Sequence, residues 1–143
     1  MITSIEPKAV QTGEIVAEKL GIHCEIAAGL HEHEREKGEI TSREEFQSTV
    51  INLFNHPDAL VFGKETANQA LKRFSNAVET IMTSYPCKTI AITSHGTVMA
   101  LFYGKISGAD PVEFWQKLGL PAFYVVAWPE YQVISESLTS ETF

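Results

Sequence analysis

The sequence contains little cysteine, few basic residues and no long apolar run, and each shortage excludes a class of protein. Its 143 residues include two cysteines, Cys24 and Cys87, which are too few for a disulfide framework and lack metal-site spacing. We expect both to be buried free thiols. Lys and Arg number 11 against 18 Asp and Glu, and the resulting net charge of −7 disfavours nucleic acid as a partner.

The chain also lacks the features of membrane and exported proteins. No segment approaches the roughly 20 consecutive apolar residues that span a bilayer, so no membrane association is expected. The first residues have neither the basic nor the apolar region of a signal peptide, which predicts a cytoplasmic protein. With 44% hydrophobic residues and the length of one ordinary domain, residues 1–143 are predicted to form a single domain.

The pattern of apolar residues predicts alternating helices and short strands. Helices are expected at residues 7–20, 42–56, 66–85, from Gly96 onward, and at 110–118. Strands are expected at 23–27, 88–93, 122–128 and 132–138, the last two as a hairpin or an edge pair, and residues 2–4 resemble the end of another strand. Residues 88–93 have the continuous apolar character of a strand that lies centrally in a sheet. This order predicts a three-layer α/β/α sandwich with a mostly parallel sheet.

The segment Ser94-His95-Gly96-Thr97 is the clearest candidate for a functional site. It joins a predicted strand to a predicted helix, and ligands of open α/β sheets bind just beyond such strand ends. A helix that begins there offers free backbone N–H groups to an anion, so a phosphate group is the expected ligand. Gly96 would let that ligand approach the backbone closely. The alternative is that His95 is a turn residue with only a structural role.

Two further groups of residues could carry chemistry. Glu32 lies between His31 and His33 in a polar loop, and a partly desolvated carboxyl group can protonate a leaving oxygen. The two histidines could instead converge on a metal ion, with His23 as a distant third ligand, although no fuller ligand cluster is visible. Lys8 is either a solvated helix residue or part of a site.

Three segments occur in an order and spacing that resemble the histidine phosphatase superfamily, the phosphoglycerate mutase-like proteins. They are residues 3–12, 29–35 and 94–97, and the resemblance extends over about residues 2–138. It implies that Lys8 holds the phosphoryl group of a small phosphorylated ligand, where the family has an Arg, that Glu32 is the general acid, and that His95 is the second histidine of the phosphate pocket. It also implies that neither a metal nor another cofactor is required.

One family motif is missing from the chain. The resemblance implies a nucleophilic histidine in an Arg-His-Gly segment on the first strand, and no such segment occurs in the sequence. We therefore expect a phosphoglycerate mutase-like fold that is incomplete at its N-terminus, either a shortened gene product or a truncated phosphatase, with little or no phosphatase activity. The alternative is a catalytically dead module that binds a phosphorylated ligand or a protein. Unpaired strand edges in such a fold also predict homo-oligomers or strand exchange.

Overall fold

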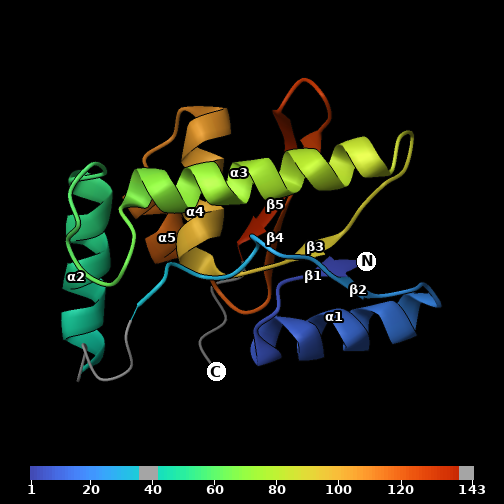
Figure 1. Ribbon diagram of the computed structural model, residues 1–143, viewed down its shortest axis with the longest axis horizontal. Coiled ribbons are helices and arrows are strands. Elements are labelled where there is room, and N and C mark those ends of the chain that lie inside the picture. The colour runs from blue at the N-terminus through green and yellow to red at the C-terminus, as the bar shows by residue number, and fades with distance from the viewer. Residues whose placement is uncertain (36–41, 139–143) are drawn as a thin grey trace.

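The computed structural model describes residues 1–35 and 42–138 (Figure 1). Its helices are α1 (Pro7–Leu20), α2 (Arg43–Asn55), α3 (Ala67–Ser84), α4 (Gly96–Ser107) and α5 (Pro111–Lys117). Its strands are β1 (Ile2–Thr3), β2 (Glu25–Ile26), β3 (Ile92–Thr93), β4 (Ala122–Ala127) and β5 (Gln132–Leu138). The predicted α/β fold is confirmed, with α1 on one side of the parallel strands and α3 and α4 on the other (Figure 1).

Local sequence signals set the helix boundaries. α3 begins at a capping box, in which the Thr66 hydroxyl accepts a hydrogen bond from the Gln69 amide and the Gln69 side chain accepts one from the Thr66 amide. Ser42 caps α2 by accepting from a backbone amide one turn further on, as the sequence predicts. α1 starts with Pro7 and ends at Gly21, whose φ of 63° is a left-handed conformation that glycine adopts without strain.

The three short parallel strands form one sheet in the order β2-β1-β3. Ile2 of β1 pairs with Glu25 on one side and with Ile92 on the other. β4 and β5 form a separate antiparallel hairpin, in which Ala122 pairs with Leu138. Because β1 and β3 are parallel neighbours, their carboxyl ends lie side by side, where ligands of α/β sheets bind.

The position of β3 differs from the prediction. We expected residues 88–93 to form a buried central strand, but within residues 1–35 and 42–138 the central strand is β1 and β3 lies at the edge of its sheet. Only Ile92 and Thr93 are paired, and Ala91 is exposed. The reason is that the hairpin forms its own sheet and does not pair with β3, so β3 has one neighbour where a central strand needs two.

The prediction that both cysteines are buried is wrong. Cys24 is half-buried, whereas Cys87 is an exposed free thiol. Cys87 lies in the turn between α3 and β3, where its φ is 59°. Turns run over the surface of a protein, so the position in the fold outweighs the tendency of free cysteine to be buried.

The apolar core lies mainly between the helices. Leu53 of α2, Ala70 of α3 and Val98 of α4 have no exposed surface, and the loop residue Leu30 is buried equally deeply beside them. This packing fixes α4 and the preceding turn, which carries His95. Among the described residues, no helix has both the length and the apolar content needed to cross a membrane.

Candidate functional site

His95 lies where β3 gives way to α4, as the sequence predicts. It occupies the N-cap position of α4 in an extended conformation, and only 10% of its side chain is exposed. Its Nε2 atom is 2.9 Å from the Ser4 hydroxyl oxygen, and the Glu6 amide donates a hydrogen bond to that same oxygen. The imidazole is therefore held against the carboxyl end of β1.

Glu32 occupies the N-terminus of α4. Its carboxylate accepts hydrogen bonds from the amides of Thr97 at 3.2 Å, Val98 at 3.3 Å and His33 at 2.9 Å. A carboxylate is favourable at this end of a helix because the free N–H groups there carry a partial positive charge. The amides that we expected to bind phosphate are thus bonded to Glu32 in this structure.

Glu6 joins the same cluster and was missed in the sequence. Its Oε1 atom accepts a hydrogen bond from the Glu32 amide at 2.7 Å and lies 3.5 Å from His95 Nε2. Lys8 is an exposed residue in the first turn of α1, two positions further along. Glu6 is distant from Glu32 in sequence and precedes a helix-starting proline, so its pattern predicts a helix boundary and not a site residue.

The surroundings of His95 disfavour its protonated form. Burial lowers the pKa of this imidazole most strongly, the carboxylates of Glu32 and Glu6 oppose that effect, and electrostatic interactions with Lys8 and His31 lower the pKa further. The net direction is a pKa below the ordinary value of 6.5. His95 is therefore mainly neutral near pH 7 when no anion is bound.

A measurable pH dependence of stability follows from this. As the pH falls below about 6.5, His95 takes up a proton in the unfolded chain before it does so in the folded chain, and this favours the unfolded chain. The contribution of neutral His95 to stability is therefore complete above about pH 6.5 and is lost as the pH falls through the folded-state pKa. We expect urea unfolding to show a smaller loss of stability on acidification in His95→Gln than in the unchanged chain. His23→Gln is the matched control, because the His23 side chain is 81% exposed. Equal losses in His95→Gln and the unchanged chain would contradict the prediction.

Arg73 of α3 holds the loop that carries Glu32. Its guanidinium donates to the carbonyl oxygens of Gly29 at 2.8 Å, His31 at 2.9 Å and Glu32 at 3.2 Å. It also forms an ion pair with Glu65, whose side chain is only 10% exposed. Arginine suits this role because its planar group presents five N–H donors in fixed directions.

Glu65 extends the same network to the far end of the loop. One of its carboxylate oxygens accepts a hydrogen bond from the Glu34 amide at 3.0 Å, and its carbonyl oxygen lies 2.7 Å from His33 Nε2. Burial acts to raise the pKa of Glu65, but the hydrogen bonds from Arg73 and from the Glu34 amide, together with the charge of Arg73, outweigh it, and the pKa is lowered. The loop is thus fixed on both sides of Glu32 by charged groups from outside it.

The structure does not bring His31 and His33 together as metal ligands. His33 is buried against the ring of Phe62, with ring centroids 4.6 Å apart, whereas His31 bonds to Glu34 at 3.1 Å. His23 is exposed and precedes β2 in the chain. In the described part of the chain, no three His, Cys, Asp or Glu side chains are grouped so that they could hold a metal ion.

The fold and the site define an α/β protein in which an acid, a buried imidazole and a nearby lysine gather at the carboxyl ends of two parallel strands. Residues 1–139 match the family described as the histidine phosphatase superfamily (branch 1). The chain therefore belongs to the histidine phosphatase superfamily, with a phosphoglycerate mutase-like fold, as its three sequence segments predict. A search of curated proteins found no match to the chain.

Proposed function

We propose that this chain is a histidine phosphatase-type domain that binds the phosphoryl group of a small phosphomonoester and hydrolyses it very slowly or not at all. The observation that carries the proposal is that Glu32 and His95 lie together at the ends of β1 and β3, beside Lys8, while no Arg-His-Gly segment supplies a nucleophile. Acid and binding groups are present without the group that attacks phosphorus.

Each residue has a distinct role in this proposal. Lys8 and His95 bind the phosphoryl oxygens, and the exposure of Lys8 leaves its ammonium group free to move toward a ligand. Glu32 would transfer a proton to the leaving oxygen. Gly96, the first residue of α4, does not expose its backbone to a ligand on the side of its absent Cβ, because a Cβ there would meet Trp115 and Leu118 at 3.5–3.7 Å.

The negative charge of the site sets a condition on binding. Glu6 and Glu32 both face His95, and Glu32 occupies the amides at the start of α4. A phosphate dianion at those amides must displace the Glu32 carboxylate or meet it in protonated form. A bound dianion would also favour protonation of His95, so the proposal expects binding to be accompanied by uptake of a proton at that imidazole.

His95 is not suited to replace the missing nucleophile. In the covalent mechanism, a histidine nitrogen forms a bond to phosphorus while the bond from phosphorus to the leaving oxygen breaks, and the acid donates its proton to that oxygen. The Nε2 atom of His95 is directed to the Ser4 hydroxyl and flanked by Glu6. Its position supports charge neutralisation on a transferring group rather than in-line attack.

Thermal unfolding with inorganic phosphate tests the binding claim. A ligand that binds only the folded chain raises its melting temperature, by an amount equivalent to about 2.7 kcal/mol when its concentration is about 100 times Kd. We expect a saturable rise that is lost in Lys8→Met, because Lys8 is exposed and its removal leaves the fold intact. Lys19→Met, at the other end of α1, is the matched control.

A rise in melting temperature with phosphate can also have a cause other than binding at the site. Phosphate also stabilises proteins without specific binding, because it is excluded from their surface. A rise that is equal in the unchanged chain and in Lys8→Met would show only this general effect and would refute phosphoryl binding at the site.

A further inference from the structure

Glu6 occupies the N-cap position of α1, yet its side chain does not cap that helix. Polar side chains at an N-cap usually accept a hydrogen bond from the amide two or three residues further along. The Glu6 carboxylate accepts no such bond from the first turn of α1. It extends instead toward the loop that carries Glu32 and toward the ring of His95, so a role in capping does not account for its position.

One oxygen of the Glu6 carboxylate contacts both of the predicted site residues. This Oε1 atom accepts a hydrogen bond from the Glu32 amide at 2.7 Å and lies 3.5 Å from His95 Nε2, close enough for an ion pair when the imidazole is protonated. The side chain of Glu6 is 37% exposed and that of His95 is 10% exposed. A partly buried pair of this kind is screened much less by salt than a pair in open solvent.

The backbone of Glu6 also acts on His95, through Ser4. The Glu6 amide donates a hydrogen bond to the Ser4 hydroxyl oxygen at 3.3 Å, and His95 Nε2 lies 2.9 Å from that same oxygen. Ser4 has no exposed surface, so its hydroxyl is held in place by these neighbours. Glu6 thus fixes the position of the imidazole through both its side chain and its backbone.

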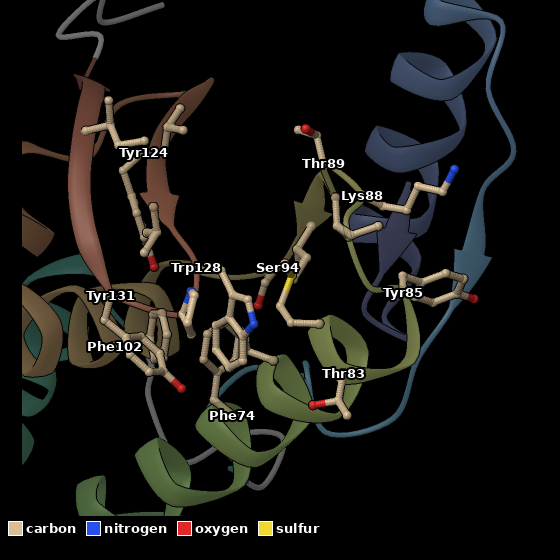
Figure 2. A pocket seen from close by; sticks show the side chains of 18 of the residues that line it. Phe74, Thr83, Tyr85, Lys88, Thr89, Ser94, Phe102, Tyr124, Trp128 and Tyr131 are labelled. Atoms are coloured by element: carbon tan, nitrogen blue, oxygen red, sulfur yellow. The ribbon is translucent and has the colours of Figure 1, made fainter.

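The loop that carries Glu32 is fixed to the neighbouring strand as well. Ser94 follows β3 and lines the apolar groove between β3 and the hairpin (Figure 2). Its hydroxyl donates a hydrogen bond to the Leu30 carbonyl oxygen at 2.7 Å. This bond and the bond from the Glu32 amide to Glu6 anchor residues 30–32 near the carboxyl ends of β3 and β1. Of these two anchors, Glu6 is the one that carries a charge.

Four charged or titratable groups act on the His95 imidazole besides its burial. Glu32 and Glu6 favour the protonated form, whereas Lys8 and His31 disfavour it. A phosphate dianion at the start of α4 must displace Glu32 or meet it in protonated form, so in the complex Glu32 no longer supplies its full charge to His95. Glu6 then remains as the carboxylate beside the imidazole.

We propose that Glu6 is a positioning residue, which holds the imidazole of His95 in place as a cation when an anion binds and so links phosphoryl binding to proton uptake. The proton comes from solvent, and no bond to phosphorus is formed or broken. This inference rests on the proposed function, because the anion is the phosphoryl group of the ligand. It adds a role for a residue that acts through His95 and need not touch the ligand.

An NMR titration of the His95 ring in the ligand-free chain tests the action of Glu6 on the imidazole. Glu6→Gln removes the charge but keeps a side-chain oxygen that can accept the bond from the Glu32 amide. We expect the pKa of His95 to be lower in this variant than in the unchanged chain, because one of the two carboxylates that favour the cation is gone. Glu18→Gln is the matched control, since Glu18 is an exposed residue of α1 and the net charge changes equally.

Calorimetric titration with inorganic phosphate tests the link to binding. Measurements in two buffers with different enthalpies of ionisation give the number of protons taken up per phosphate bound. Phosphate itself exchanges protons with the buffer, so the variants are compared at the same pH near neutrality. We expect Glu6→Gln to take up fewer protons than the unchanged chain and Glu18→Gln, by at most about one proton, since one imidazole binds one.

Glu6→Leu separates the charge of Glu6 from its hydrogen bond. Leu removes both, whereas Gln removes only the charge. We expect the amide proton of Glu32 to exchange with solvent faster in Glu6→Leu than in Glu6→Gln, because the 2.7 Å bond is lost. The pKa of His95 should be lower than in the unchanged chain in both variants, because both lack the carboxylate.

Two results would overturn the role of Glu6 while leaving phosphoryl binding intact. One is a His95 pKa in Glu6→Gln equal to that in Glu18→Gln, and the other is equal proton uptake by Glu6→Gln and the unchanged chain. Absence of saturable phosphate binding to the unchanged chain would refute the proposed function, and the link to proton uptake would fail with it. The failure of this inference alone and the failure of the proposed function are therefore distinguishable.

Discussion

Purified chain is expected to hydrolyse p-nitrophenyl phosphate about a millionfold more slowly than a superfamily member with its nucleophile, which is the usual cost of losing the attacking group in a covalent mechanism. The sequence has five histidines, and none follows an arginine. Glu32 could raise the rate only by proton transfer to the leaving oxygen, which usually contributes about a hundredfold to ten-thousandfold. That contribution requires a nucleophile that attacks phosphorus at the same time, and the chain lacks one. Release of p-nitrophenolate, followed by absorbance, measures the rate.

His95→Ala separates weak intrinsic activity from a contaminant. Residual turnover that persists in this variant belongs to another protein in the preparation. Turnover that disappears with the imidazole would show that the chain itself hydrolyses the ester at a site that requires His95, and the proposal of an inactive chain would fail. Glu32→Gln completes the set, because it removes the transferable proton while keeping the size of the side chain, and it should leave the residual rate unchanged.

Arg73→Met is expected to lower the free energy of unfolding by about 3–5 kcal/mol, the usual effect of removing one partner of a buried ion pair. Glu65 would remain as a buried carboxylate without its cation, and three loop carbonyls would lose a donor. Urea unfolding measures the change. Lys72→Met is the matched control, because Lys72 is the preceding residue and is exposed, and it should change stability little.

A second substitution identifies the cause of that loss. Glu65→Gln in the Arg73→Met background removes the uncompensated charge and should restore part of the stability, whereas simple loss of packing around Arg73 would not be restored. Because the pKa of Glu65 is lowered in the folded chain, its contribution to stability is present above the ordinary value of 4.5 and is lost as the pH falls through the folded-state pKa. The effect of Arg73→Met should therefore be smaller in acid.

Sequence reasoning predicted the elements whose signals are local. The capping box at Thr66 and the apolar period after it located α3, and alternation located β5 at Gln132–Leu138 with its partner strand. It also placed His95 at the start of a helix. These features depend on residues within a few positions of one another, where propensity and periodicity act.

The features that sequence reasoning missed depend on distant residues. Arg73 bonds to carbonyl groups 41 to 44 residues earlier, and Glu6 bonds to an amide 26 residues later. In its local sequence each of these residues has only the pattern of a polar side chain on or beside a helix. The edge position of β3 was missed for a related reason, since an apolar run indicates that a strand can be covered but not which strands lie beside it.

The sheet order has a consequence for how the chain folds during synthesis. β1 (Ile2–Thr3) precedes β2, yet its other neighbour in the sheet, β3, begins only at Ile92. Closing so long a loop costs entropy before its contacts form, and topologies with distant pairing fold slowly. β1 can therefore pair with β3 only after Ile92 has been synthesised, and the helices between these two strands, whose contacts are local, can form before that.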